Sequence, residues 1–195
     1  MGRLWVLVLA ALLGGCGNTI SSLRYEPITI AQRANIPAIT NVAATDQRKE
    51  APRRLATIMG GFGNPLKTLD TAKPVKDEVV DAFTQGLRVR GFLAEAGTAK
   101  LHIELTIRKF DADMIIGRTA RIDLTMSLVD QAGLVMFRDS AVDTQSDMKF
   151  FETGIMADIG DLRILSETLL SRTVDRMLDN PAFRAAASAG AVVVP

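Results

Sequence analysis

The chain contains 195 residues, of which 48% are hydrophobic and 23% are charged, a composition typical of a folded globular protein and not of a disordered one. Its 23 basic and 22 acidic side chains nearly balance, so the chain lacks the positive surplus that binds phosphate backbones, and we expect no nucleic-acid partner. A length of this order favours a single domain.

The first fifteen residues have the order of a secretory signal. One positive charge at Arg3 is followed by an apolar run from Leu4 to Leu13 and then by two glycines, the pattern of a cleaved signal peptide. Ten apolar residues in a helix reach about 15 Å, roughly half of a hydrocarbon core of about 30 Å, so this run is too short to span a membrane permanently. We therefore expect residues 1–15 to be removed from the mature protein.

The only cysteine, Cys16, ends this region in the sequence Leu13-Gly14-Gly15-Cys16, which resembles the lipobox of bacterial lipoprotein precursors. The resemblance implies that the thiol receives a diacylglyceryl group, that cleavage leaves Cys16 as an acylated N-terminus, and that two or more acyl chains hold the protein on a membrane. It also implies the periplasmic face of the outer membrane, because lipoproteins retained in the inner membrane of enteric-type bacteria commonly have aspartate where this chain has Gly17. The alternative is an unmodified cysteine behind an ordinary signal peptide. Apart from the covalent lipid we expect no cofactor.

The first half of the mature chain predicts short strands followed by a helix. We expect residues 16–27 to form the lipidated N-terminus and a polar tether, and residues 28–184 to form the folded domain. Strand-like segments are predicted at residues 28–30, 38–45 and 55–59, and a glycine-rich turn is predicted at residues 60–65. A helix is predicted from Pro74 to Arg90, because proline suits a first helical position, apolar residues recur at helical spacing, and Gly91 suits the left-handed residue that ends a helix.

The second half predicts strands that are buried on one face. From Leu101 the hydrophobic period becomes two, which is typical of such strands. Segments 101–108, 122–128 and 134–144 share this pattern, and the turn at 130–133 predicts an antiparallel meander. An amphipathic helix is predicted over residues 159–178, ended by Asn180-Pro181, and residues 185–195 are expected to form a flexible tail.

This order of elements predicts an α+β domain in which two main helices pack on one face of a mostly antiparallel sheet. The chain has four features of note: Asp46-Gln47-Arg48 after a strand, Arg90-Gly91-Phe92 at the end of the first helix, the alternating strand from Leu101, and Asp179-Asn180-Pro181 followed by Phe183. In these features the chain resembles the YajG-like family of bacterial lipoproteins. Because that family is largely uncharacterised, the resemblance implies the fold and an envelope location, and it carries over no catalytic residues.

No group of side chains in the sequence forms a recognisable catalytic or metal site. His102 is the sole histidine, so a triad or a nitrogen and sulfur metal site has no second member. The loop Gly60–Thr68 lacks the glycine that a phosphate loop requires directly before its lysine. Asp111 and Asp113 lack the regular acidic spacing of a calcium loop, and we expect them in a solvated turn between strands.

Two pairs of residues are candidates for binding a protein partner. Asp46 and Arg48 follow a predicted strand, where loop residues often carry function, and they form either a local ion pair or turn, or a recognition site. Phe150 and Phe151 either belong to the core or contribute to an exposed apolar patch.

Three hypotheses for the function follow from these observations. The leading one is a non-enzymatic, membrane-anchored envelope lipoprotein that binds an envelope protein or helps to maintain the envelope, in an oligomeric state that the sequence leaves open. The second is an accessory lipoprotein of a transport or lipid-trafficking system, with an apolar groove between helix and sheet for an acyl chain. The third is a hydrolase that uses carboxylates such as Glu104 and Asp123, and it requires two acids to converge in a cleft.

Overall fold

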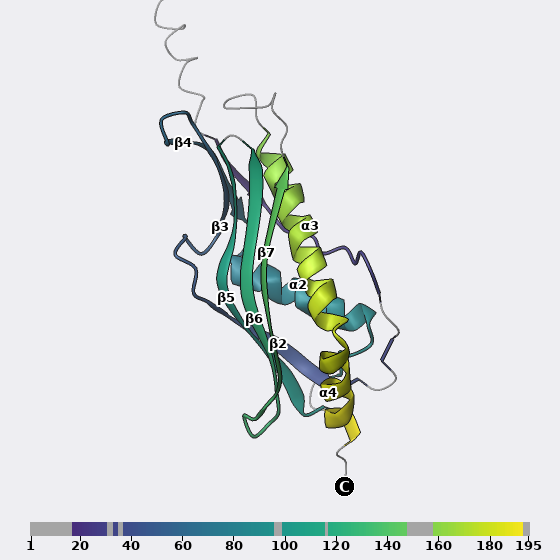
Figure 1. Cartoon of the computed structure of the whole chain (residues 1–195). Helices are drawn as coiled ribbons and strands as arrows, with labels where there is room; N and C mark the ends of the chain where they lie inside the picture. Colours follow the sequence, from purple (N-terminus) through teal and green to yellow (C-terminus); the bar gives the residue numbers. More distant parts are fainter. Residues whose placement is uncertain are drawn as a thin grey trace, which may run out of the picture.

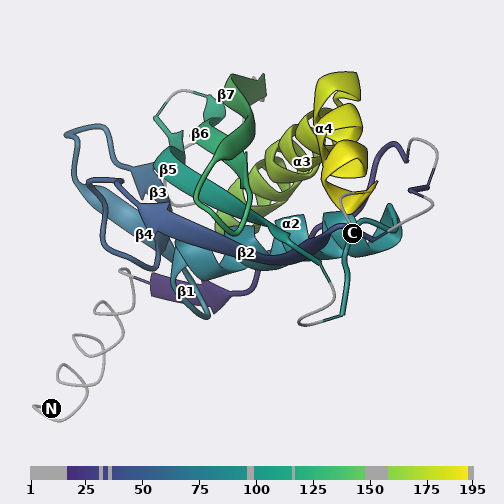
Figure 2. The same cartoon turned by 90° about the horizontal axis from the view of Figure 1, so that it is seen from below.

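The computed structural model describes residues 17–30, 33–34, 37–95, 99–115, 117–147 and 158–192. In these residues seven strands form one mixed sheet, and the helices lie on one side of it (Figures 1 and 2). The elements in chain order are β1 (Gly17–Ser21), β2 (Ile39–Asp46), β3 (Arg54–Met59), β4 (Pro65–Thr71), α2 (Val75–Val89), β5 (Leu101–Met114), β6 (Arg118–Val129), β7 (Val135–Asp147), α3 (Ile159–Leu178) and α4 (Pro181–Val192). The predicted α+β class is therefore confirmed, with α4 as an additional helix.

Strand β5 organises the sheet. On one side it pairs with β6, which pairs in turn with β7, so the predicted antiparallel meander is confirmed. On its other side β5 pairs in parallel with two strands in succession, β2 along its first half and β3 near its end, where Ile58 lies opposite Met114. Strand β4 continues the sheet from β3, and β1 forms the edge beside β4.

The sheet has two ends, which we name by one residue each. At the Gly17 end, β1 begins opposite Lys67 of β4, and the β3–β4 turn (residues 60–64) and Ile115 lie at the same level because β3 and β5 both run toward this end. At the Leu134 end lie the β6–β7 turn (residues 130–134) and α4. Figure 1 shows the Gly17 end at the top and the Leu134 end at the bottom.

The core lies between the sheet and the helices. Along β5 the residues Leu101, Ile103, Leu105 and Ile107 are buried, while the residues between them face the open side of the sheet, as the alternating pattern predicts. Helices α2 and α3 approach closely at Gly86, where an added Cβ would come within 2.8 Å of Val174 and Leu178. A glycine at this position allows the two helices to pack against each other and still cover the sheet.

Three predictions about the chain ends are wrong. The expected tether is part of the fold: residues 17–21 form β1, and residues 22–30, which we call the strap, cross α2 and α3 before the chain reaches β2. Residues 28–30 form no strand, because the backbone amides of Ile28 and Thr29 donate to Asp175 and not to a neighbouring strand. Residues 185–192 of the expected flexible tail are part of α4, and this helix buries Phe183 and Ala187.

Two further differences concern the sheet. The sequence does not predict strand β4, since only Leu69 and Thr71 are buried along it and the alternation is correspondingly weak. Asp111 and Asp113, which we expected in a turn, lie within β5, because this strand extends to Met114. Both carboxylates face Arg121 of β6, and this ion pairing compensates for acidic residues in a strand.

Candidate functional site

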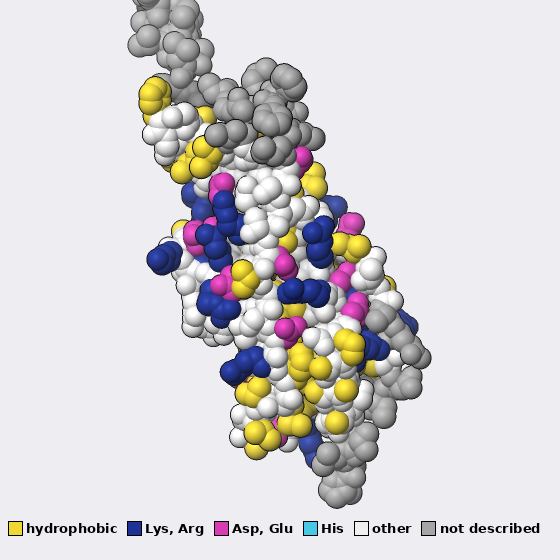
Figure 3. Space-filling model, viewed as in Figure 1, with side chains coloured by type: hydrophobic (Ala, Val, Ile, Leu, Met, Phe, Trp, Pro, Cys, Tyr) yellow, Lys and Arg dark blue, Asp and Glu magenta, His cyan; other side chains and the backbone are white. Residues whose placement is uncertain are grey.

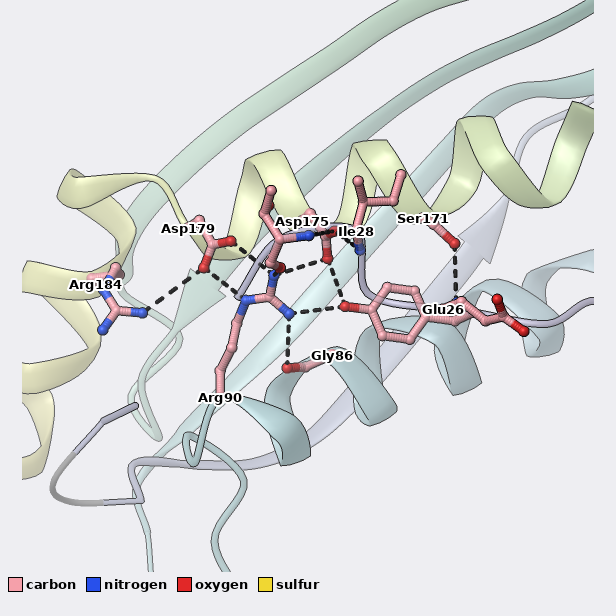
Figure 4. A network of polar contacts seen from close by, with 10 residues as sticks. Glu26, Ile28, Gly86, Arg90, Ser171, Asp175, Asp179 and Arg184 are labelled. Carbon is pink, nitrogen blue, oxygen red and sulfur yellow. Dashed lines mark hydrogen bonds and ion pairs between the residues drawn. The ribbon is translucent and has the colours of Figure 1, made fainter. Parts of the chain in front are cut away.

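A buried polar cluster surrounds Arg90, a fully buried side chain that follows α2. Its Nε and Nη2 atoms form two parallel hydrogen bonds to the carboxylate of Asp179 at 2.7 and 2.8 Å. Nη2 also lies 2.8 Å from Asp175, and Nη1 donates to the hydroxyl of Tyr25 at 2.8 Å and to the carbonyl of Gly86. Figure 4 shows this cluster between α2, α3 and the strap. All five guanidinium hydrogens therefore have acceptors within the protein.

The Arg90 cluster attaches the strap to the helices. Tyr25 donates its hydroxyl hydrogen to Asp175 at 2.6 Å, and the other oxygen of Asp175 accepts the backbone amides of Ile28 and Thr29 at 2.7 and 3.0 Å. Burial raises the pKa of the Tyr25 hydroxyl, and the hydrogen bond to Asp175 raises it further. Burial alone would lower the pKa of Arg90, but its hydrogen bonds to Asp179 and Tyr25 outweigh burial and raise it. Arg90 therefore stays charged and Tyr25 stays neutral near neutral pH, and the cluster has a structural role.

Asp46 and Arg48, the predicted site pair, form an ion pair in the loop between β2 and β3. The guanidinium of Arg48 is buried and contacts both carboxylate oxygens of Asp46, at 3.0 and 2.9 Å. Its remaining hydrogens are donated to the carbonyls of Pro52, Arg54 and Phe110. Burial acts to raise the pKa of Asp46, but the hydrogen bonds from Arg48 lower it below its usual value. The geometry corresponds to the local ion pair, and recognition of a partner by these two residues stays a prediction.

This ion pair explains how β2 and β3 can lie in line along one side of β5. Between the two strands the chain leaves the sheet and returns. Arg48 donates to three backbone carbonyls at this junction, those of Arg54 in β3, Phe110 in β5 and Pro52 in the loop. A buried carbonyl without a donor would be costly, so Arg48 stabilises the junction of the three strands.

The other sequence-predicted residues do not converge on a reaction centre. His102 lies on the open face of the sheet, 3.3 Å from Glu104. Glu104 is opposite Ser127 on β6, whereas Asp123 is opposite Lys109 and binds Arg108 at 2.6 Å, so these two acids are not cross-strand neighbours. Within the described ranges, no group of three or more His, Cys, Asp or Glu side chains is arranged to hold a metal ion.

Cys16, Phe150 and Phe151 lie outside the described residues. Their predicted roles in lipidation and partner binding therefore stay predictions. None of the described helices is long and apolar enough to cross a membrane.

Two open hollows flank the strap. One lies against α3 and is lined by Glu26, Ile28, Arg163 and Glu167, among others. Glu167 in this hollow already accepts hydrogen bonds from the Arg24 amide at 3.0 Å and from Arg163 at 2.9 Å. The other hollow lies against α2 and contains Glu78. Their charged lining is unsuited to an acyl chain.

Glu78, an acid beside the strap, has a raised pKa, and burial is the main cause. Because the folded protein binds this proton more tightly than the unfolded chain does, stability falls as the pH rises from the ordinary range of glutamate through the raised pKa. We expect Glu78→Gln to be at least as stable as the parent at pH 7, since glutamine can still accept the Leu23 amide that Glu78 accepts at 3.2 Å.

Urea unfolding at several pH values checks this prediction. The advantage of Glu78→Gln should shrink as the pH falls below about 4, where unfolded glutamates are protonated. Glu26→Gln is the matched control, because Glu26 lines the same hollow but is exposed. A destabilised Glu78→Gln variant at neutral pH would show that the carboxylate charge is required.

An exposed apolar surface remains at the Leu134 end. Leu134, Val135 and Met136 are consecutive, and their exposed fractions are 63%, 41% and 41%. Helix α4 adjoins them through Phe183, which packs edge-on against Phe137 at 5.9 Å between ring centres. Figure 3 shows hydrophobic side chains over α4 and the lower part of the sheet. We call residues 134–136 the hairpin patch.

Sequence reasoning missed the hairpin patch, although a signal was present. A half-buried strand alternates apolar and polar residues, and the run Leu134-Val135-Met136, which leads into β7, breaks that rule. At least one of them must face solvent, since only one face of the sheet is covered by helices.

The comparisons with known proteins support the fold. No protein-family model and no curated protein sequence matches the chain. The crystal structure of a Xanthomonas campestris protein of the DUF330 family aligns with a TM-score of 0.61 and 13% identity, over 88% of this chain and 99% of that one. A minor lipoprotein from Acinetobacter baumannii aligns with a TM-score of 0.40 and 11% identity, over 74% and 95% of the two chains. Lipoprotein GNA1162 from Neisseria meningitidis aligns with a TM-score of 0.32 and 14% identity, over 74% and 100%. The chain is thus similar in fold to the Xanthomonas protein, and membership of the YajG-like family stays a prediction.

Proposed function

We propose that this chain is a non-enzymatic lipoprotein of the bacterial cell envelope that binds a protein partner through its Leu134 end. Acyl chains on Cys16 would anchor it, at the periplasmic face of the outer membrane if the organism has one. The observation that carries the proposal is the placement of the hairpin patch. It lies at the end of the sheet opposite Gly17, and therefore far from the proposed anchor.

The geometry supports a partner more than a reaction. Arg48 and Arg90 have all their donors engaged inside the fold. Both hollows beside the strap contain acids: Glu26 and Glu167 in one, and Glu26, Glu78 and Asp81 in the other. Glu167 is already bound by Arg163, Glu78 accepts the Leu23 amide, and Asp81 pairs with Lys73. A carboxylate hydrolase needs an acid and a base free to contact substrate.

The lipid-trafficking alternative has less support. It requires an apolar groove between helix and sheet, but in the described residues this layer is filled by buried side chains such as Phe83, Leu105 and Leu170. A bound acyl chain would have to displace them.

Site-specific photo-cross-linking in cells tests the proposal. A photoreactive residue at Met136 should give discrete protein adducts, and Leu134→Asp in the same chain should abolish them by placing a charge in the contact. Thr144, an exposed polar residue on β7, is the matched control position and should give no such adduct. Equal labelling at Met136 and Thr144, or adducts that survive Leu134→Asp, would contradict the assignment. An adduct of twice the chain's mass would identify the partner as a second copy.

A further inference from the structure

The glycine-rich turn between β3 and β4 carries the most exposed large apolar side chain of the described residues. Phe62 is fully exposed at the tip of this turn, and Ile115, in the neighbouring β5–β6 connection, is 63% exposed. A single exposed apolar residue is ordinary, but a fully exposed phenylalanine and an exposed isoleucine at the same end of the sheet are candidates for an interaction surface. Neither residue takes part in the function proposed above.

The backbone of the turn holds Phe62 away from the domain. The Gly60 amide donates to the Asn64 carbonyl at 2.7 Å, and the Gly63 amide donates to the Gly60 carbonyl at 2.9 Å. Gly63 has a φ of +77°, which glycine adopts without strain. The two hydrogen bonds and the glycine close a tight turn, with Phe62 projecting at its apex.

Both residues lie at the end of the sheet where β1 begins, Phe62 in the turn that precedes β4 and Ile115 after β5. Gly17 is opposite Lys67, two residues from Pro65, where β4 begins after the turn. With about 4.8 Å between strands and about 3.4 Å per residue, Gly17 is roughly 8 Å from Pro65. Ile58 is opposite Met114, so Ile115 follows at the level of the turn. Figure 1 shows this end of the sheet at the top, and Figure 3 shows hydrophobic side chains there.

The proposed anchor leaves no spacer between lipid and fold. Cys16 is joined to Gly17 by one peptide bond, and Gly17 is already the first residue of β1. A lipoprotein with a long tether could hold its domain away from the bilayer, but a strand that begins at the next residue places this end of the sheet against the lipid headgroups.

We propose that Phe62 and Ile115 form a second membrane contact, in which the β3–β4 turn inserts its apolar tip into the leaflet that holds the acyl chains of Cys16. This inference rests on the proposed lipid anchor. An apolar group that enters the interface adds to the binding from the acyl chains, and the second contact fixes the orientation of the domain. The Leu134 end then points away from the membrane.

Tryptophan fluorescence tests this contact in the processed, acylated protein. The chain has a single tryptophan, Trp5, which the proposed cleavage before Cys16 removes, so Phe62→Trp introduces the only one. The protein is reconstituted on vesicles of phosphatidylethanolamine and phosphatidylglycerol, with or without bromine on the acyl chains. We expect the introduced indole to emit at shorter wavelength on vesicles than in urea, and brominated lipid to quench most of its emission. Met136→Trp, at the opposite end of the sheet, is the control and should not be quenched.

The outcomes separate this inference from the anchor on which it rests. If the processed protein fails to float with the vesicles, the anchor and the second contact both fail. If the Phe62→Trp variant floats and brominated lipid does not quench its emission, only the second contact is overturned. Equal quenching at positions 62 and 136 would overturn the assignment of the contact to the Gly17 end.

Discussion

Replacing Arg90 by methionine is expected to lower the free energy of unfolding by about 3–5 kcal/mol, because removal of one partner of a buried ion pair leaves the other charge without compensation. The carboxylate of Asp175 is buried, with a side-chain exposed fraction of 4%, and that of Asp179 is largely buried. Methionine fills a similar volume but donates no hydrogen bond. Urea unfolding of the purified protein measures the change.

The strap should be released in the same variant. Without Arg90, the carboxylate of Asp175 keeps only the hydrogen bonds from Tyr25 and from the amides of Ile28 and Thr29. The strap then loses the contacts between Arg90 and Tyr25 and is bound less tightly to the helices. Limited proteolysis should then cut between residues 22 and 30 under conditions that leave the parent intact. Arg88→Met is the matched control, since Arg88 lies in the last turn of α2 but is exposed.

A milder variant keeps this prediction testable if Arg90→Met does not fold. Tyr25→Phe removes only the hydroxyl, which bonds Arg90 and Asp175, and should cost about 1–2 kcal/mol while also exposing the strap to protease. Stabilities of both variants within about 0.5 kcal/mol of the parent, the range of ordinary surface substitutions, would contradict the structural role assigned to the cluster.

The Arg90 cluster shows where prediction from the sequence reaches its limit. Arg90 and Gly91 are predictable as a helix end, because that signal is local, and Gly91 does adopt the expected positive φ of +74°. The partners of Arg90 are 65, 85 and 89 residues distant in the chain, at Tyr25, Asp175 and Asp179. No periodicity links such positions. The Asp46 and Arg48 pair, with a separation of two residues, is by contrast predictable as one of two alternatives.

Helix α4 is not predicted from the sequence, for a different reason. Asn180-Pro181 signals the end of α3, which is correct, but it is also the start of α4. The side chain of Asn180 accepts the Ala182 amide at 2.9 Å, and proline is favoured in the first helical position. The alanine-rich sequence that follows contains few large apolar side chains, and the burial of Phe183 against Phe92 and Phe137 reveals its place in the fold.

The position of the fold relative to the anchor emerges only when sequence and structure are combined. The sequence predicts acylation at Cys16 but places a tether after it. In the structure that tether consists of β1 and the strap, which is attached through Tyr25 and Asp175 to both helices. A pull on the N-terminus would therefore be transmitted directly to the folded domain.

Replacing Cys16 by alanine is expected to move the protein from the membrane fraction to the soluble periplasmic fraction. The variant lacks the thiol that receives the lipid, and without two or more acyl chains no stable anchor remains. Phe62 and Ile115 alone bury too little apolar area to hold the domain on a bilayer, so the loss should be nearly complete. Fractionation and mass spectrometry of the N-terminus check both the location and the absence of acyl groups.

Gly17→Asp is the control that separates loss of the lipid anchor from transfer of the anchored protein to a different membrane. An added Cβ at Gly17 meets no atom within 4 Å, so the substitution should not disturb β1. This variant keeps Cys16 and should remain acylated and membrane-bound, and in an enteric-type host it should move toward the inner membrane. If Cys16→Ala instead stayed with the membranes, the apolar N-terminus or a partner would be the anchor. The membrane contact proposed for Phe62 and Ile115 would then lose its basis, because that proposal depends on acyl chains attached directly before β1.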